Sequence, residues 1–237
     1  MATTHQQRCR PRSESRRSEI LDVALQVFLE NGYSGATIDL VVARANASKA
    51  TIYSYFGGKE GLFTAIIEER TEQIISCLSA QDFSDADVPV ALAQIARRLL
   101  MASLTPEAIG IYRLILSEGF RFPNVARTFY RLGPDRVTGH LARILGDWRD
   151  RGLIAVEDPE LAATQFLTVA LGELRLQAVA GLPPDDLDAA VEHNVRNAVE
   201  PFWRYVRPGG LQVPLQSLSM GEDRSSANNP RRQRRTS

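Results

Sequence analysis

Hydrophobic residues recur every three or four positions along most of this chain, which is the spacing of one face of an α-helix. No stretch alternates apolar and polar residues over a useful length, so the pattern predicts an all-α protein. The expected helices are Ser15–Asn31, two short helices between Thr37 and Phe56, a long helix opened by Lys59, and Val90–Leu104, Pro106–Ser117, Asn124–Leu132, Pro134–Arg151, Pro159–Ala180 and Pro184–Val206.

Two short helices around a tight corner are predicted between Thr37 and Phe56. Thr37 is a good N-cap, because its hydroxyl can accept a hydrogen bond from an unpaired amide of the first turn. Asn46 ends that helix, since its short amide side chain tolerates the left-handed backbone region. Ser48 caps the next helix, which buries Ile52 and Phe56. The segment therefore predicts a helix-turn-helix.

The second short helix carries small, hydroxyl, basic and phenolic side chains on its outward face. Tyrosines interleaved with Lys49 suit phosphate oxygens and base edges better than plain solvent. Lys59, at the positive end of the next helix, suits a phosphate. The alternative is a surface helix whose tyrosines pad a neighbouring domain. The expected DNA-binding residues are Thr37, Ser48, Lys49, Ala50, Thr51, Tyr53, Ser54, Tyr55 and Lys59.

Glycine and proline mark the ends of several helices. Gly32 is expected to end the first helix, and Gly133-Pro134 divides two helices of the body. Proline costs little in a first turn, where its missing amide hydrogen has no partner. Pro201 lies instead inside a helical stretch, so we expect a kink or an early helix end there.

Composition is that of an ordinary globular protein, and the distribution of charge matters more than its sum. The chain has 237 residues, of which 44% are hydrophobic and 24% charged. Its formal net charge of zero argues at first sight against a nucleic-acid partner. Residues 1–17, however, hold five arginines and one glutamate, a net +4. Such an arm can reach DNA phosphates or a neighbouring groove, or it is a solvated tail.

The remaining reactive side chains indicate no catalytic, metal or cofactor site. Cys9 and Cys77 are too few and too far apart for a disulfide framework and suit a reducing cytosol. The three histidines are isolated, and no hydrolase, zinc-protease or dinucleotide motif occurs. No apolar run approaches the roughly 18 to 20 residues of a membrane span. We expect a cytoplasmic, nucleoid-associated protein that is not an enzyme and needs no membrane.

The run VFLENGYSGATIDLVVARANASKATIYSYFGGKEGLF, from Val27 to Phe63, resembles the DNA-binding domain of the TetR/AcrR family of transcriptional regulators. It shares the family's glycine-aromatic pair, its threonine-initiated helix and most of its K-G-T-(L/I)-Y-x-(Y/H)-F pattern. Three residues depart: Asn46 stands where Gly is preferred, Ala50 where Gly or Pro is common, and Gly58 where Ser, Asn or Asp is usual. Ala50 puts operator preference in doubt rather than DNA binding.

A weaker resemblance extends the likeness to roughly residues 15–205. The runs IYRLILSEGFRFPNVARTFYRLGP and RGLIAVEDPELAATQFL resemble the ligand-binding half of the AefR-like subgroup. This resemblance implies a pocket for a small, often apolar effector. Binding of the effector moves the fourth helix and changes the distance between the two DNA-binding heads. The candidate lining residues, for which ordinary core packing is the alternative, are Met101, Tyr112, Phe120, Phe129, Trp148 and Phe166.

The last two helices carry apolar residues at the spacing used in helix packing. Two such helices from each of two subunits would form a four-helix bundle about a two-fold axis. Burial within one chain is the alternative, but the resemblance favours a homodimer whose recognition helices, about 34 to 36 Å apart or a multiple, read a palindromic operator. The expected interface residues are Leu167, Leu171, Leu174, Ala178, Val191, Val195, Val199 and Phe202.

Four regions are predicted in all: a basic flexible arm over 1–14, a helix-turn-helix domain over 15–60, an effector-binding and dimerisation domain over 61–206, and a disordered tail over 207–237. Three functions fit this organisation. They are a dimeric transcriptional repressor released from double-stranded operator DNA by a small-molecule effector, a nonspecific or architectural DNA-binding protein, and a helical protein with a vestigial motif. The large helical half beyond the DNA-binding head favours the first over the second.

Overall fold

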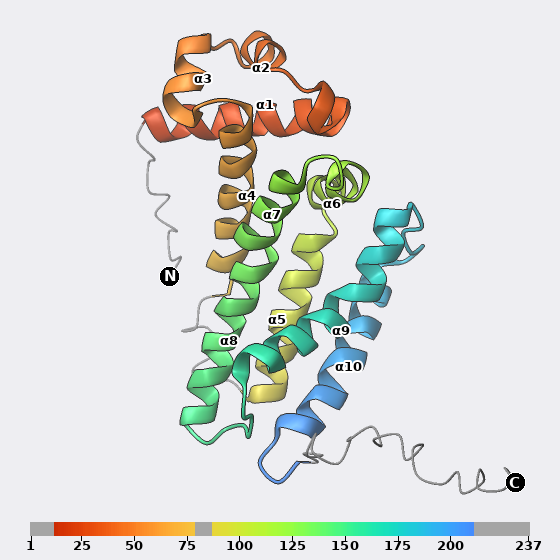
Figure 1. The fold of residues 1–237 in the computed structure, drawn as a ribbon. Coiled ribbons are helices and arrows are strands. Elements are labelled where there is room, and N and C mark those ends of the chain that lie inside the picture. Colours follow the sequence, from red (N-terminus) through yellow and green to blue (C-terminus); the bar gives the residue numbers. More distant parts are fainter. Residues whose placement is uncertain (1–11, 79–86, 211–237) are drawn as a thin grey trace, which may run out of the picture.

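The computed structural model describes residues 12–78 and 87–210, and every element in those ranges is an α-helix, as predicted (Figure 1). The expected arm over 1–11, the loop at 79–86 and the tail from 211 onward lie outside the described residues. The helices are α1 (Arg12–Gly35), α2 (Ile38–Ala45), α3 (Lys49–Phe56), α4 (Lys59–Ser76), α5 (Val88–Ser103), α6 (Pro106–Glu118), α7 (Pro123–Leu132), α8 (Pro134–Asp150), α9 (Pro159–Ala180) and α10 (Leu187–Val206).

Helices α1, α2 and α3 form a head at one end of the molecule, and α4 runs from this head into a bundle of the remaining helices (Figure 1). The apolar stripe of α1, including Ile20, Leu25 and Phe28, is buried against α2, α3 and α4. The same core continues into α6 and α7. The head is therefore not packed as a separate body that ends at residue 60.

A second hydrophobic core holds the rest of the bundle. It is formed by α5, α8, α9 and α10, with α8 against α9 and α5 against α10. Trp148 and Phe166, two of the expected effector-pocket residues, lie inside this core with 2% and 1% of their surface exposed. Their large rings fill space between helices rather than line a cavity.

Most of the residues expected at a dimer interface belong to this second core as well. Seven of the eight are buried within the chain, and Ala178 is half-buried. Their spacing marks a buried stripe, but such a stripe does not say which helix covers it, and here α5, α8 and α10 of the same chain do. The apolar residues that α9 leaves exposed lie on another face: Leu161, Val169 and Leu176.

Helix ends agree with the sequence to within a few residues, with two informative differences. Gly32 breaks the helical backbone at φ 68° as expected, yet a further short turn continues to Gly35. Helix α10 runs through Pro201 to Val206, so of the expected kink or early end, the early end does not occur. Phe202 and Val206, which follow the proline, are buried, and their packing offsets the hydrogen bond that Pro201 cannot donate.

Candidate DNA-reading helix and effector cavity

The corner between α2 and α3 has the geometry expected from its residues. The Thr37 hydroxyl accepts from the Leu40 amide at 3.3 Å, and the Ser48 hydroxyl accepts from the Thr51 amide at 3.0 Å. Asn46 adopts the left-handed conformation at φ 46° and ψ 48°, and among the described residues it is the only non-glycine with positive φ. The helix-turn-helix geometry is confirmed at each of these positions.

Two of the five N-terminal arginines lie in α1 and hold this corner in place. The Arg16 guanidinium donates to the carbonyl oxygens of Ala45 and Asn46 at 2.7 and 2.8 Å. The Arg17 guanidinium lies 5.5 Å from the ring centroid of Phe56 in α3. These contacts satisfy carbonyls that the end of α2 leaves unpaired. Arg16 and Arg17 therefore brace the reading helix, and the arm is shorter than the charge count suggested.

The outward face of α3 is open to solvent. Tyr53 and Tyr55 are 55% and 45% exposed, so no part of the described chain covers them. Lys49, Ala50 and Ser54 are exposed too, together with the capping residues Thr37 and Ser48. Thr51 is half-buried, and its hydroxyl is bonded to that of Ser48 at 2.8 Å. The expected residues of the reading helix are thus at least partly accessible, although Tyr53 and Tyr55, two positions apart, point to different sides of α3.

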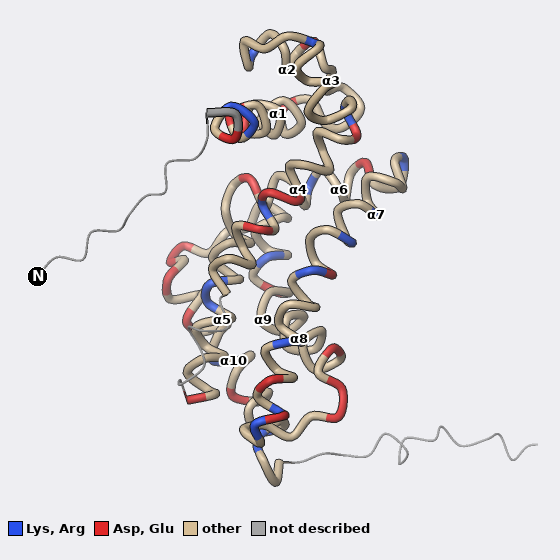
Figure 2. The backbone as a smooth tube through the Cα atoms, turned by 90° about the vertical axis from the view of Figure 1, so that its left-hand side faces the viewer, with Lys and Arg blue, Asp and Glu red and all other residues tan. Residues whose placement is uncertain are grey.

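The charge on this face is balanced rather than strongly positive. The Lys49 ammonium pairs with the Asp39 carboxylate at 2.7 Å, and hydrogen bonding to that carboxylate raises the pKa of Lys49. Arg44 pairs with Glu30 at 2.5 Å. Residues 15–60 hold five basic and five acidic side chains, and charges of both signs are interspersed along the described helices (Figure 2). Phosphates would have to displace these carboxylates to reach the cations.

Lys59 points into the junction between head and bundle. Its ammonium donates to the Ser34 carbonyl at 3.1 Å and lies 4.6 Å from the ring centroid of Tyr33. Burial lowers the pKa of Lys59, and the nearby charge of Glu118 partly opposes that shift. Two of the three ammonium hydrogens remain for other partners. A phosphate contact by Lys59 stays a prediction.

Glu118, at the end of α6, clamps the head to the bundle. Its two carboxylate oxygens accept from the backbone amides of Tyr33 and Ser34, both at 2.8 Å. Gly32 has φ 68°, a conformation that strains other residues, and a Cβ atom there would also meet the Glu118 carboxylate. No local pattern indicates this contact, because 84 and 85 residues separate the partners.

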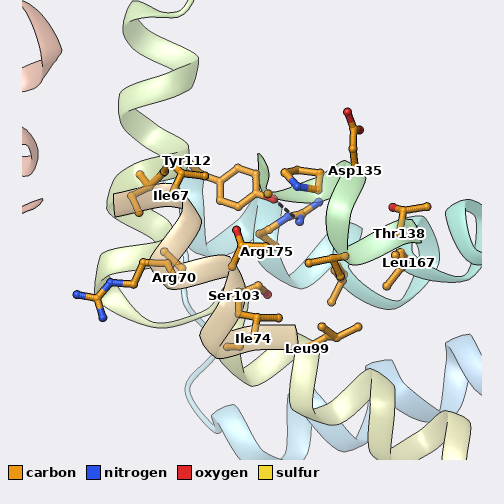
Figure 3. A pocket seen from close by; sticks show the side chains of 18 of the residues that line it. Ile67, Arg70, Ile74, Leu99, Ser103, Tyr112, Asp135, Thr138, Leu167 and Arg175 are labelled. Atoms are coloured by element: carbon orange, nitrogen blue, oxygen red, sulfur yellow. Dashed lines mark hydrogen bonds between the residues drawn. The ribbon is translucent and has the colours of Figure 1, made fainter. Parts of the chain in front are cut away.

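A cavity of about 1070 Å³ lies below this junction and opens to solvent (Figure 3). Side chains from six helices, α4 to α9, line it, and its walls are largely apolar. Two of the expected pocket residues, Tyr112 and Phe129, are on the lining. Met101 is 38% exposed and not on the lining, and Phe120 is completely exposed beyond the end of α6. Together with the core residues Trp148 and Phe166, these two are corrections to the expected pocket.

Arg175 is a cavity residue that sequence reasoning missed. It extends from α9 toward Tyr112 of α6 (Figure 3), and its guanidinium donates to the Tyr112 hydroxyl at 2.7 Å. The guanidinium carbon lies 4.6 Å from the Tyr112 ring centroid, and Phe129 packs edge-on against that ring. The one available signal was a single arginine within the largely apolar run LTVALGELRLQAVA, which also holds Glu173 and Gln177.

The described residues contain no group of three or more His, Cys, Asp or Glu side chains placed to hold a metal ion. No single helix in the described ranges is long and apolar enough to cross a membrane. Helices α5 and α6 pass that test only as a pair bent by 69°.

A braced helix-turn-helix, joined by α4 to a helical bundle with a ligand-sized cavity, defines the class of helix-turn-helix DNA-binding proteins with a second, ligand-binding half. Residues 20–66 match the family model for bacterial regulatory proteins of the tetR family, and residues 90–206 match that for the C-terminal domain of AefR-like transcriptional repressors. The chain belongs to the TetR family of bacterial transcriptional regulators, which act by binding DNA and are not enzymes.

Similar proteins agree with this assignment over most of the chain. The HTH-type transcriptional repressor SCO4008 of Streptomyces coelicolor is 37% identical over 160 residues, which cover 67% of this chain and 77% of that protein. A TetR-family regulator structure from Mesorhizobium loti superposes with a TM-score of 0.74 at 27% identity, covering 84% of this chain and 100% of the other. The flavonoid-responsive regulator FrrA gives 0.68 at 32% identity, covering 82% and 98%.

Proposed function

We propose that this protein is a dimeric repressor that binds a palindromic operator through α3 and leaves it when a small molecule occupies the cavity. The observation that carries this proposal is the course of α4. Its first turns pack in the core of the head, where Leu62 and Phe63 are buried, and its later turns line the cavity with Ile67 and Ile74. A ligand that displaces α4 therefore acts on the element that supports the reading helix.

Operator reading is assigned to the exposed face of α3 and its caps. Tyr53 and Tyr55 present phenol hydroxyls and ring edges, and Lys49 presents an ammonium once Asp39 is displaced. These groups suit phosphate oxygens and base edges in a major groove. Ala50 keeps that part of the helix small, so that backbone and DNA can approach closely.

The balanced charge of the head argues against the alternative of an architectural DNA-binding protein. Nonspecific affinity comes almost entirely from neutralising phosphates with lysine and arginine. Within residues 15–60 the basic and acidic side chains are equal in number, and Lys49 and Arg44 are both paired with carboxylates. Affinity from such a head depends more on specific contacts than on charge.

Two contacts connect helices that line the cavity to the head. Arg70 of α4 lines the cavity and pairs with Asp22 of α1 at 2.5 Å. Glu118 of α6 holds the amides that follow α1. FrrA responds to flavonoids. For this chain we propose that a small molecule likewise controls DNA binding, but we do not propose that this molecule is a flavonoid.

The dimer is assigned to the exposed stripe of α9, defined by Leu161, Val169 and Leu176. These three residues are 46%, 58% and 62% exposed and recur at a spacing of eight and seven residues, which places them on one helical face. Gly172 lies in the same stripe, and apart from its own stretch of helix no described residue comes within 4 Å of a Cβ atom placed on it. A second copy could therefore pack closely along this stripe.

The decisive experiment is selection of bound fragments from a random DNA pool by the full-length protein. An inverted repeat is expected, because two identical heads related by a two-fold axis read identical half-sites. Tyr53→Ala should then weaken binding to the selected site by about 10-fold, within the range for one lost base or phosphate contact.

The matched control is Tyr205→Ala, which removes an equally exposed tyrosine from α10. It should leave DNA affinity and dimer mass unchanged. Recovery of fragments with no common sequence would favour the architectural alternative, and full affinity in Tyr53→Ala would remove α3 from the proposed interface.

A further inference from the structure

Arg175 is a cation on the cavity lining that has no carboxylate partner in the described part of the chain. Its side chain is half-buried, and its one hydrogen bond goes to a neutral phenol, that of Tyr112. The guanidinium has five N–H donors, so most of them are left for another acceptor. By contrast, Arg70 pairs with Asp22 outside the cavity. A partly desolvated guanidinium with unused donors favours a ligand that brings negative charge.

Several other polar groups on the lining have hydrogen-bond partners elsewhere. The hydroxyls of Thr164 and Thr168 donate to carbonyls four residues earlier in α9, at 2.9 and 2.7 Å. The Ser103 hydroxyl donates to the Leu100 carbonyl at 2.8 Å. The lining carboxylates Glu107, Asp135 and Glu160 sit in the first turns of α6, α8 and α9.

Those first-turn carboxylates lie where the helix dipole stabilises a negative charge, so they do not need Arg175. Figure 3 shows Asp135 directed away from the Tyr112 and Arg175 pair. This pair is therefore a polar recognition point of the cavity, and it faces walls made by Ile67, Ile74, Leu99 and Leu167.

We propose that the effector is an amphipathic anion, with its carboxylate on Arg175 and Tyr112 and its apolar body against the aliphatic walls. This inference rests on the effector function proposed for the same cavity and adds the chemical class of the ligand. Two N–H groups of a guanidinium match the two oxygens of a carboxylate, which gives both charge and orientation. The apolar body contributes through burial.

Tyr112 is suited to complete this contact. Its oxygen already accepts from Arg175, so its own proton is available to a ligand oxygen. Burial raises the pKa of Tyr112, against an opposing effect of Arg175. The hydroxyl therefore keeps its proton throughout the neutral range and remains a donor.

Calorimetric titration of the full-length protein, in the absence of DNA, tests the proposal with three probes that share one chain length: decanoate, 1-decanol and decyltrimethylammonium. Decanoate should bind at least about 10-fold more tightly than 1-decanol, and the cation more weakly than either. Arg175→Gln should abolish the preference for decanoate while leaving 1-decanol binding unchanged. Arg175→Lys, which keeps the charge, should retain part of it, and Tyr112→Phe should reduce it without abolishing it.

Arg127→Gln is the matched control, because it removes an exposed arginine of α7 that does not line the cavity. It should leave all three affinities unchanged. Equal binding of decanoate and 1-decanol, binding of neither, or an undiminished preference in Arg175→Gln would each overturn the proposal. Failure of operator binding would leave this titration intact, and decanoate that binds without altering operator affinity would refute the effector function but not the anion site.

Discussion

Asn46 places a side chain where the backbone favours glycine, and the surrounding residues make this tolerable. An L-residue in the left-handed region costs roughly 1–2 kcal/mol, less for asparagine than for others. Arg16 donates to the carbonyl oxygens of Ala45 and Asn46, which stabilises the corner from the outside. The turn residue and its brace come from segments 30 residues apart. The corner therefore depends on α1 as well as on its own sequence.

Replacing Asn46 tests how much of this stability is conformational. Asn46→Ala should lower the free energy of unfolding by about 1 kcal/mol, because alanine lacks the local amide bond that eases the left-handed conformation. Asn46→Gly should be neutral or slightly stabilising, since glycine adopts that conformation freely. Urea denaturation followed by circular dichroism measures both. Equal effects of the two substitutions would show that the backbone conformation of Asn46 does not limit stability.

The caps of this corner were predictable, and its long-range partners were not, for one physical reason. Thr37, Asn46 and Ser48 act on amides or backbone angles within three or four residues, so their roles follow from the local sequence. Arg16 and Glu118 act on backbone groups 29 to 85 residues away, which only the folded chain brings near. Arg175 was missed likewise, because its partner Tyr112 is on another helix.

At the scale of elements, α9 shows how helix existence is easier to predict than helix environment. Its ends, Pro159 and Ala180, agree with the prediction to the residue, and the proline marks its first turn. Its 22 residues nevertheless present three faces: one in the core, one on the cavity and one exposed. A stripe of leucines does not distinguish these surroundings, since each of them accepts apolar residues.

The link between α6 and the end of α1 gives an element-scale prediction. Glu118→Gln keeps the shape of the side chain but leaves one oxygen to accept where two accepted before. We expect the free energy of unfolding to fall by about 1–2 kcal/mol, the range for a hydrogen bond to a charged group that is partly exposed. The amides of Tyr33 and Ser34 should exchange faster with solvent deuterium, because their acceptors are weakened.

Glu68→Gln is the control for this substitution, since it changes an exposed carboxylate of α4. Its exchange pattern and stability should match those of the unaltered protein. Unchanged exchange at residues 33 and 34 in Glu118→Gln would show that this carboxylate does not hold the head against the bundle.

At the scale of the whole molecule, the distribution of charge orients the protein on DNA. Residues 61–206 hold 20 acidic and 14 basic side chains, whereas residues 15–60 are balanced. A bundle with net negative charge is repelled by phosphates, so the head is the part that approaches the duplex. In the proposed dimer a second copy reads the other half-site, and the exposed stripe assigned to the subunit contact is on α9, in the bundle (Figure 1).

The exposed stripe and the buried leucines of α9 predict opposite outcomes when substituted. Val169→Glu should convert a dimer into a monomer near 26.3 kDa without unfolding it, because it places a charge in an apolar interface while leaving the chain's own core intact. Leu174→Ala, at a residue first expected in the interface but only 5% exposed within the chain, should instead lower the free energy of unfolding by about 2–5 kcal/mol and leave the dimer in place.

Light scattering after size exclusion gives the mass of each variant, and urea denaturation gives its stability. Leu116→Glu, at an equally exposed leucine of α6, should change neither. A dimeric Val169→Glu variant would place the subunit contact on another surface, whereas a folded, monomeric Leu174→Ala variant would restore the original interface and require the bundle to open for dimerisation.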